Sequence, residues 1–165
     1  MRVFYKCSLR IWLIFLAAAS AFMLGSALVA QYGFGLHPCE LCLYQRYPYA
    51  AIVALGLAGA MLVKSPRALW ALVALCGLLL LADAGLAAYH AGVESGIFPG
   101  PSACSSTARP SETIEEMRLA LMNAPLVPCN QPMLQVLGVS MAGWNAMAAL
   151  LLAVATFVVI RKTKS

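Results

Sequence analysis

The chain has 165 residues, of which 62% are hydrophobic and only 10% are charged, and its mean hydropathy is +0.84. A soluble domain of this size could not hide so much apolar surface, because a large share of its residues would stay at least partly exposed. The composition therefore excludes an ordinary soluble domain and favours a protein embedded in lipid.

Four apolar segments are long enough, or nearly so, to cross a membrane, since a span of a ~30 Å hydrocarbon core takes about 20 residues. In chain order they are residues 11–30, 47–63, 69–89 and 141–160. They leave loops at about 31–46 and 90–140 and too little chain for a separate globular domain. We therefore predict an all-α membrane protein, a single transmembrane domain over residues 1–165 folded as a four-transmembrane-helix bundle.

The first segment also resembles a secretory signal peptide, because basic residues precede an apolar run. Small residues at Gly25 and Ala27 would even suit a peptidase. However, the run continues to Ala30, which is long enough to span, and cleavage would leave only three spans. We expect the segment to be retained as a helix.

The basic residues indicate the orientation of this bundle. Eight of them fall on one side: Arg2, Lys6, Arg10, Lys64, Arg67, Arg161, Lys162 and Lys164. The positive-inside rule places this side, with both termini, in the cytoplasm and the two longer loops outside. The net charge of +5 is thereby explained by topology, and it does not indicate a nucleic-acid surface.

Four of the six cysteines fall on the outer side, namely Cys39, Cys42, Cys104 and Cys129. In a bacterium this compartment is the oxidising periplasm, where disulfides form and persist. Four cysteines allow three pairings, and their spacing favours Cys39 with Cys42 and Cys104 with Cys129. A zinc site is a weaker alternative, because structural zinc sites more often use two tight pairs.

The tight pair in PCELC, Cys39 and Cys42, is hereafter called the CxxC pair. Purely structural disulfides are the other alternative for these residues. A Cys-x-x-Cys ring closes almost no chain, so it removes little unfolded-state entropy and stabilises a fold poorly. Such rings suit reversible thiol exchange better, and the spacing therefore predicts redox chemistry.

The residues after the pair favour a thiolate at Cys42. Helix N-terminal N–H groups and a guanidinium both stabilise a thiolate, and Arg46 lies at i+4 from Cys42. Glu40 opposes this by disfavouring a second negative charge. Because residues 48–63 alone are too short to cross the core, we expect the helix to reach back toward Cys42 with a kink near Pro48. The alternative is that this whole edge dips into the membrane interface.

Two ionisable residues of the third span are candidates for the same site. His90, at the outer end of the span, could lie beside Cys42 and bind a ligand or move a proton; alternatively it is a tolerated interfacial residue. Asp83 falls on a similar helix face, and an ionisable residue inside a span indicates function by default. The alternative for Asp83 is a protonated or hydrogen-bonded structural residue.

The second outer loop begins with several glycines and prolines and is expected to be irregular. Residues 113–116 resemble a capping box, and an apolar stripe follows to residue 122. We expect a short amphipathic helix here that lies on the membrane surface or offers methionines to a partner. Cys104 and Cys129 flank this segment, so their bond would be open to exchange.

Taken together, these motifs resemble the DsbB family, bacterial inner-membrane proteins that reoxidise the periplasmic thiol oxidase DsbA. The similarity covers essentially the whole chain and includes PCELCLYQR, the Tyr89-His90 end of the third span, GPSAC around Cys104 and VPCNQP around Cys129. The run from Leu137 to Trp144 also looks like the family's entry into its fourth helix.

The resemblance implies a role for each cysteine. Reduced DsbA would attack the Cys104–Cys129 disulfide and form a mixed disulfide with Cys104. Cys129 would then attack Cys39, and the Cys42 thiolate would reduce a bound quinone, ubiquinone or menaquinone, through a charge-transfer adduct.

Arg46 occupies the place of the family's quinone-site arginine, and His90 that of a histidine near the quinone. Gln45 stands where some relatives carry an acid. Two other readings stay open: a specialised relative serving one dedicated thiol oxidase, and a membrane scaffold whose disulfides only brace its loops.

Overall fold

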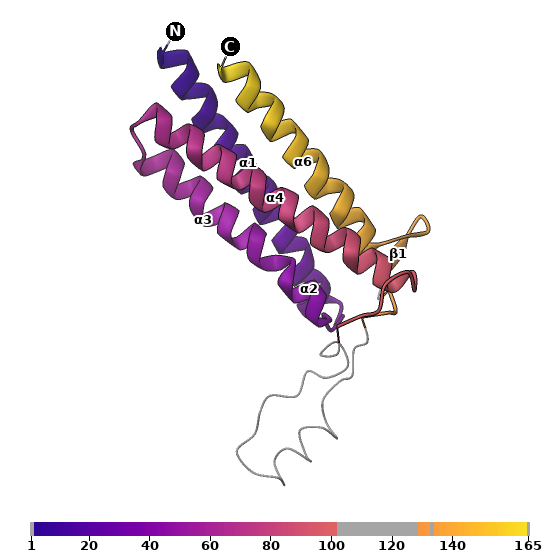
Figure 1. Cartoon of the computed structure of the whole chain (residues 1–165). Helices are drawn as coiled ribbons and strands as arrows, with labels where there is room; N and C mark the ends of the chain where they lie inside the picture. Colours follow the sequence, from indigo (N-terminus) through magenta and orange to yellow (C-terminus); the bar gives the residue numbers. More distant parts are fainter. Residues whose placement is uncertain (1, 102–128, 133, 165) are drawn as a thin grey trace, which may run out of the picture.

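The computed structural model describes residues 2–101, 129–132 and 134–164. Helices dominate this part of the chain, and four long ones lie alongside one another (Figure 1). The elements are α1 (Arg2–Gly33), α2 (Glu40–Tyr44), α3 (Arg46–Leu62), α4 (Pro66–Glu94), β1 (Gln135–Val136), β2 (Val139–Ser140) and α6 (Met141–Lys164). The short helix expected within 113–122 lies outside the described residues.

Within the described residues, three helical segments are long and apolar enough to cross a membrane: Cys7–Gly33, Pro66–Glu94 and Met141–Thr163. The prediction of a helical, multi-pass membrane protein is therefore confirmed. The remaining predicted span, 47–63, is present as α3, but its 17 residues reach only about 26 Å at ~1.5 Å per residue. Whether α3 crosses the whole hydrocarbon core thus stays a prediction.

The surface of the long helices is apolar, as expected of helices in contact with lipid. Phe22 of α1, Met61 of α3 and Leu151 of α6 are each at least 70% exposed. The interior is apolar as well, with Leu13, Ile52 and other aliphatic side chains fully buried.

A close contact between α1 and α3 depends on Gly56. A Cβ placed on Gly56 would lie 2.9 Å from the carbonyl oxygen of Leu13 and 3.0 Å from Cβ of Ala17. Only the smallest residue lets the two backbones approach this closely. The contact fixes α3 against α1 and so positions the chain that leads into α3.

The chain enters α3 through a break rather than through a proline kink. The five-residue helix α2 is followed by Gln45, which ends α2 and precedes α3. Pro48 falls in the first turn of α3, where a proline costs no hydrogen bond. The helix therefore does reach back toward Cys42, as a separate short segment joined at Gln45.

The tight α3–α4 turn and both chain ends lie at one end of the molecule, and α2 lies at the other (Figure 1). In the turn, Arg10 of α1 donates a hydrogen bond from Nη2 to the Val63 carbonyl oxygen at 3.0 Å. Pro66 then starts α4, a position where its missing N–H is harmless. The basic residues of the termini and of this turn are thus gathered at the end opposite α2.

A two-stranded hairpin leads into α6 at the α2 end. Gln135 pairs with Ser140 across the hairpin, and its two turn residues, Leu137 and Gly138, both have positive φ, 54° and 77°. This is the turn geometry that matches the twist of two-residue hairpins. The indole N–H of Trp144 donates to the Val136 carbonyl oxygen at 3.1 Å, which holds the hairpin against the first turn of α6.

Candidate active site

The CxxC pair lies at the start of α2. Cys39 is the N-cap residue, and its Sγ accepts a hydrogen bond from the backbone N–H of Cys42 at 3.3 Å. The two sulfur atoms are 2.8 Å apart and both cysteines are free thiols. This is the dithiol form of the pair, with one sulfur donating to the other.

The environment favours a thiolate at Cys39 and a thiol at Cys42, which corrects the expectation from the sequence. Hydrogen bonds from the Cys42 thiol and from His90 hold the pKa of Cys39 at about 5, against the opposing effect of burial. The pKa of Cys42 is raised, first by its hydrogen bond to Cys39 and then by burial. The capping position of Cys39 is the physical reason, because the Cys42 thiol and backbone N–H both point at its sulfur.

Arg46 does not face Cys42, although the two lie four residues apart. Its guanidinium donates to Gln31 Oε1 at 2.5 Å and to the Ala27 carbonyl oxygen at 3.5 Å, both on α1. These two hydrogen bonds hold the long side chain against α1, so sequence spacing from Cys42 does not decide its partner. Arg46 Nε is buried and has no partner among the described residues.

His90 lies beside the CxxC pair, but next to Cys39 rather than Cys42. Its Nε2 is 3.5 Å from Cys39 Sγ and 3.7 Å from Glu94 Oε1, while its Nδ1 is 2.8 Å from Gln45 Nε2. The ring is only 3% exposed. Ligand atoms of Cys39, Cys42 and His90 lie within 4.8 Å of one another, a set that could also bind a thiophilic metal ion.

Cys129 is disulfide-bonded, and it packs against the CxxC pair. It is 2% exposed and belongs to one buried cluster with Cys39, Leu41 and Val93. Because Cys39 and Cys42 are free, the disulfide of Cys129 does not involve either of them. Its predicted partner, Cys104, lies outside the described residues.

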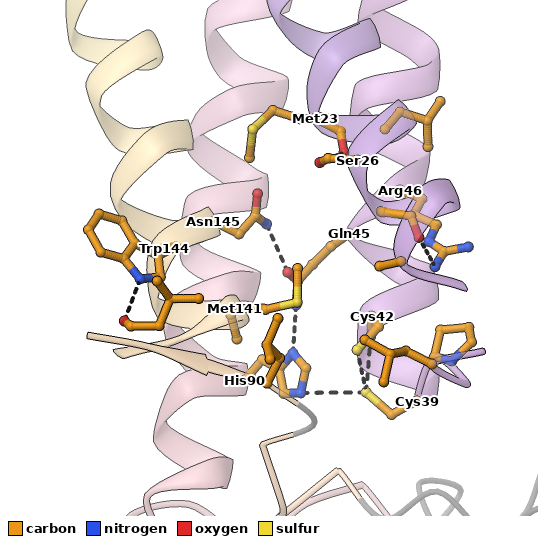
Figure 2. Close-up of a pocket in the computed structure, with 18 of the residues that line it drawn as sticks. Met23, Ser26, Cys39, Cys42, Gln45, Arg46, His90, Met141, Trp144 and Asn145 are labelled. Carbon is orange, nitrogen blue, oxygen red and sulfur yellow. Dashed lines mark hydrogen bonds between the residues drawn. The ribbon is translucent and has the colours of Figure 1, made fainter. Parts of the chain in front are cut away.

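A cavity of about 810 Å³ adjoins the pair and is enclosed by α1, α3, α4, α6 and the hairpin. Most of its wall is apolar, and Figure 2 shows the polar exceptions on the side of the cysteines. Figure 2 labels Gln45, Arg46, His90 and Asn145 among them, and the lining also includes Ser26, Glu94 and Gln131. Both residues expected from the sequence to bind a cofactor, Arg46 and His90, therefore line the same cavity as the CxxC pair.

A second, more open groove continues from this cavity along α1. It shares Phe22, Ser26 and Leu36 with the cavity and extends to Val29 and Phe34. Its lining is almost entirely apolar, so the cavity has an apolar extension toward the lipid-facing surface of α1.

Sequence reasoning missed Gln45 and Asn145. Asn145 lies in the first turns of α6 and donates hydrogen bonds to Gln45 Oε1 and Asp83 Oδ2. The available signal was an isolated amide at the start of an apolar span, where an unpaired polar group is costly. Asp83 is thereby placed in contact with the site through Asn145, a connection that helix periodicity alone did not indicate.

Comparison with known proteins identifies relatives along most of the chain. Residues 9–159 match the family described as disulfide bond formation protein DsbB. An uncharacterised protein of Rickettsia prowazekii is 29% identical over 132 residues, covering 79% of this chain and 75% of the relative.

Two relatives carry the name disulfide bond formation protein B. The one from Cupriavidus metallidurans is 29% identical over 164 residues, covering 94% of this chain and 95% of the relative. The one from Pasteurella multocida is 34% identical over 133 residues, covering 79% and 74%. With the family match over most of its length, its apolar spanning helices and its CxxC pair, the chain belongs to the DsbB family of membrane proteins for disulfide bond formation.

Proposed function

We propose that the protein reoxidises a DsbA-like periplasmic dithiol oxidase by thiol–disulfide exchange and passes the electrons to a membrane quinone. One observation carries the proposal: Cys129, already in a disulfide, is packed in the same buried cluster as Cys39 of the CxxC pair. Exchange requires that an attacking sulfur reach a disulfide sulfur, and this packing places Cys129 against the CxxC pair.

The exchange begins at the Cys104–Cys129 disulfide. A thiolate of the reduced partner attacks Cys104, the bond to Cys129 breaks, and Cys129 leaves as a thiolate. The partner's second thiol then releases the partner in its disulfide form and leaves Cys104 reduced. Two electrons and two protons have now moved from the partner to this protein.

The second exchange joins the two pairs. Cys129 attacks Cys39 of an oxidised CxxC pair, and Cys42 leaves as a thiolate. Cys104 resolves the Cys39–Cys129 bond, which restores the loop disulfide and leaves the CxxC pair as the dithiol of this structure. While Cys39 is bonded to Cys129 it cannot be a thiolate. The preference for a Cys39 thiolate therefore applies only to the fully reduced CxxC pair.

The cavity residues fit a quinone. Its volume lies in the range of small-molecule sites, most of its wall is apolar, and donors from Arg46 and Gln45 could bind the carbonyl oxygens of a ring that lies beside His90. The unpartnered Nε of Arg46 is such a donor, and the groove along α1 would take an isoprenoid tail. When bound, ubiquinone or menaquinone would accept two electrons and two protons, which restores the Cys39–Cys42 disulfide.

The positive-inside rule supports an inner-membrane orientation with both termini cytoplasmic and the active cysteines periplasmic. The termini and the basic α3–α4 turn lie together at the end opposite the CxxC pair (Figure 1). Both ends of the chain would then be on the cytoplasmic side, with an even number of crossings that includes α3.

A turnover assay tests the proposal. Purified protein should reduce a soluble quinone analogue when a reduced DsbA-like protein is supplied, and not in its absence. Cys42→Ser should abolish turnover, whereas Cys76→Ser, a buried thiol of α4 away from the pair, should retain it. Turnover that survives in Cys42→Ser would exclude this electron route, and a folded protein without any turnover would favour the scaffold alternative.

A further inference from the structure

A continuous chain of hydrogen bonds connects Asp83, in the interior of α4, to the CxxC pair. Asn145 Nδ2 donates to Asp83 Oδ2 at 3.2 Å and to Gln45 Oε1 at 2.8 Å. Gln45 Nε2 lies 2.8 Å from His90 Nδ1, and His90 Nε2 lies 3.5 Å from Cys39 Sγ. Figure 2 shows the part of this chain that runs from Asn145 to the two cysteines.

The donors and acceptors in this chain of hydrogen bonds have a fixed order, because the carboxylate of Asp83 can only accept hydrogen bonds. The end of Asn145 that faces Asp83 must therefore be its amide NH2 group. The same NH2 group faces Gln45, so Gln45 must turn its oxygen toward Asn145 and its own NH2 group toward His90. The oxygen of Asn145, Oδ1, accepts from the Tyr49 hydroxyl at 2.5 Å. A hydroxyl can donate or accept, so Tyr49 does not decide which way the Asn145 amide is oriented.

This order determines which nitrogen of His90 carries the proton. Because Gln45 donates to Nδ1, Nδ1 must be unprotonated, and in a neutral ring the proton then lies on Nε2. Both atoms that face Nε2, Cys39 Sγ and Glu94 Oε1, are acceptors. The surroundings of the two nitrogens thus agree on the same tautomer.

The residues of this chain are well shielded from water, which makes the order energetically significant. Asp83 is fully buried, His90 is 3% exposed and Gln45 is 7% exposed. Asn145 is half-buried and lines the cavity. An inverted amide would place two acceptors or two donors face to face, which is costly where water has little access. These contacts therefore favour one arrangement, in which each donor faces an acceptor, although Asp83 Oδ1 is buried without a partner among the described residues.

We propose that Asp83 is a positioning residue which, through Asn145 and Gln45, fixes His90 with its Nε2–H directed at Cys39 Sγ. His90 then donates a hydrogen bond to the Cys39 thiolate, which favours the ionised sulfur over the thiol. The inference concerns the site of the proposed function, but it rests only on the geometry of the reduced pair.

The tautomer of His90 can be measured directly, because the protein has only two histidines, His37 and His90. Full-length protein labelled with 15N-histidine and reduced in detergent is examined by NMR at about pH 8, where an ordinary imidazole is neutral. A His37→Gln variant assigns the signals. We expect wild-type His90 to show an unprotonated Nδ1 and a protonated Nε2.

Two variants perturb the chain at different points. Gln45→Glu offers only acceptors to His90, so Nδ1 should gain a proton. Asp83→Asn keeps the size of the side chain but can present either an NH2 group or an oxygen to Asn145, so both tautomers should be populated. Thr156→Val is the matched control, because it removes another polar contact between helices, the 3.3 Å bond from Trp12 Nε1, and it should leave His90 unchanged.

A second readout follows the sulfur in the same variants. With both tautomers populated, only part of the His90 population donates to Cys39, so alkylation of Cys39 below its pKa should slow by up to about twofold in Asp83→Asn. A wild-type Nδ1 that is protonated would overturn the proposal, and so would a single unchanged tautomer in Asp83→Asn. Neither readout requires turnover, so a failure here is distinguishable from a failure of the proposed function.

Discussion

The acidity of Cys39 leads to the most specific prediction, because its largest cause is one neighbouring side chain. The ordinary pKa of a cysteine is about 8.5, whereas that of Cys39 is held at about 5. The largest cause is the hydrogen bond from the Cys42 thiol, 2.8 Å away. Cys42→Ala removes this donor but keeps the backbone N–H that caps α2.

The size of the effect follows from the strength of such bonds. A hydrogen bond to a charged group contributes about 1.5–3 kcal/mol, which corresponds to roughly one to two pKa units. Removing the Cys42 thiol should therefore raise the pKa of Cys39 from about 5 to roughly 6–7. The bond from His90 and the backbone cap remain, so the pKa should stay below the ordinary value.

Iodoacetamide alkylation measures this pKa, since only the thiolate reacts. Rates at Cys39 are followed by mass spectrometry across pH in the fully reduced protein, in a Cys7→Ser, Cys76→Ser background. The rate profile should bend near pH 5 in that background and at least about one unit higher after Cys42→Ala. A bend near 8.5 at Cys39, or a lower bend at Cys42 than at Cys39, would refute the assignment of the thiolate to Cys39.

Four further outcomes are expected. The pKa of Cys39 is lower in the folded than in the unfolded protein, so its thiolate stabilises the reduced fold fully above the pKa of the unfolded state, and this contribution is lost as pH falls through about 5. Detergent-induced unfolding should show this loss for the reduced protein but not for the Cys39→Ser variant. Gly56→Ala should destabilise the protein by about 1–3 kcal/mol, because the added Cβ forces α1 and α3 apart. The control Gly25→Ala, where a Cβ would meet nothing within 4 Å, should leave the stability unchanged. Equal effects of the two substitutions in unfolding titrations would contradict the close contact. Arg46→Gln should raise the KM for the quinone analogue about tenfold or more, since a charged donor is lost. The KM for the reduced partner should change little. An unchanged KM for the quinone analogue would show that Arg46 does not bind the quinone. A partner that lacks its second thiol should stay bound to Cys104, visible as an adduct on non-reducing gels that is absent in Cys104→Ser, and the absence of any adduct with the unchanged protein would contradict the assigned roles of the loop cysteines.

The helices could be predicted from the sequence because few backbone structures are stable in lipid. Residues 69–89 and 141–160 fall inside α4 and α6, and the predicted span 47–63 differs from α3 by one residue at each end. An apolar segment in a membrane must satisfy its backbone internally, so composition and length are enough to locate it. The convergence of Arg46 and His90 on one cavity with the CxxC pair also followed from placing them at the same end of adjacent spans.

The thiolate assignment could not be predicted in this way. The i+4 argument paired Arg46 with Cys42, whereas hydrogen bonds to Gln31 and Ala27 hold the Arg46 side chain against α1. The acidity of Cys39 depends on its capping position and on His90, which is 51 residues away in the sequence. Such contacts arise from how helices pack, and local spacing carries no information about them.

The roles of Asp83 and Asn145 were hidden for the same reason. Periodicity placed Asp83 on the face of α4 that carries His90, but the connection between them passes through an amide of α6. Only the packing of α4 against α6 brings these side chains together, and neither helix encodes that contact alone.

The most direct test of the proposed electron route is its stoichiometry. Under anaerobic conditions, purified protein is given a limiting amount of reduced DsbA-like protein and an excess of quinone analogue, and both products are counted. The proposed function predicts one quinone reduced for each partner disulfide formed, whereas Cys42→Ser should reduce no quinone and oxidise no more than one partner for each loop disulfide. Partner oxidation without matching quinone reduction would contradict it.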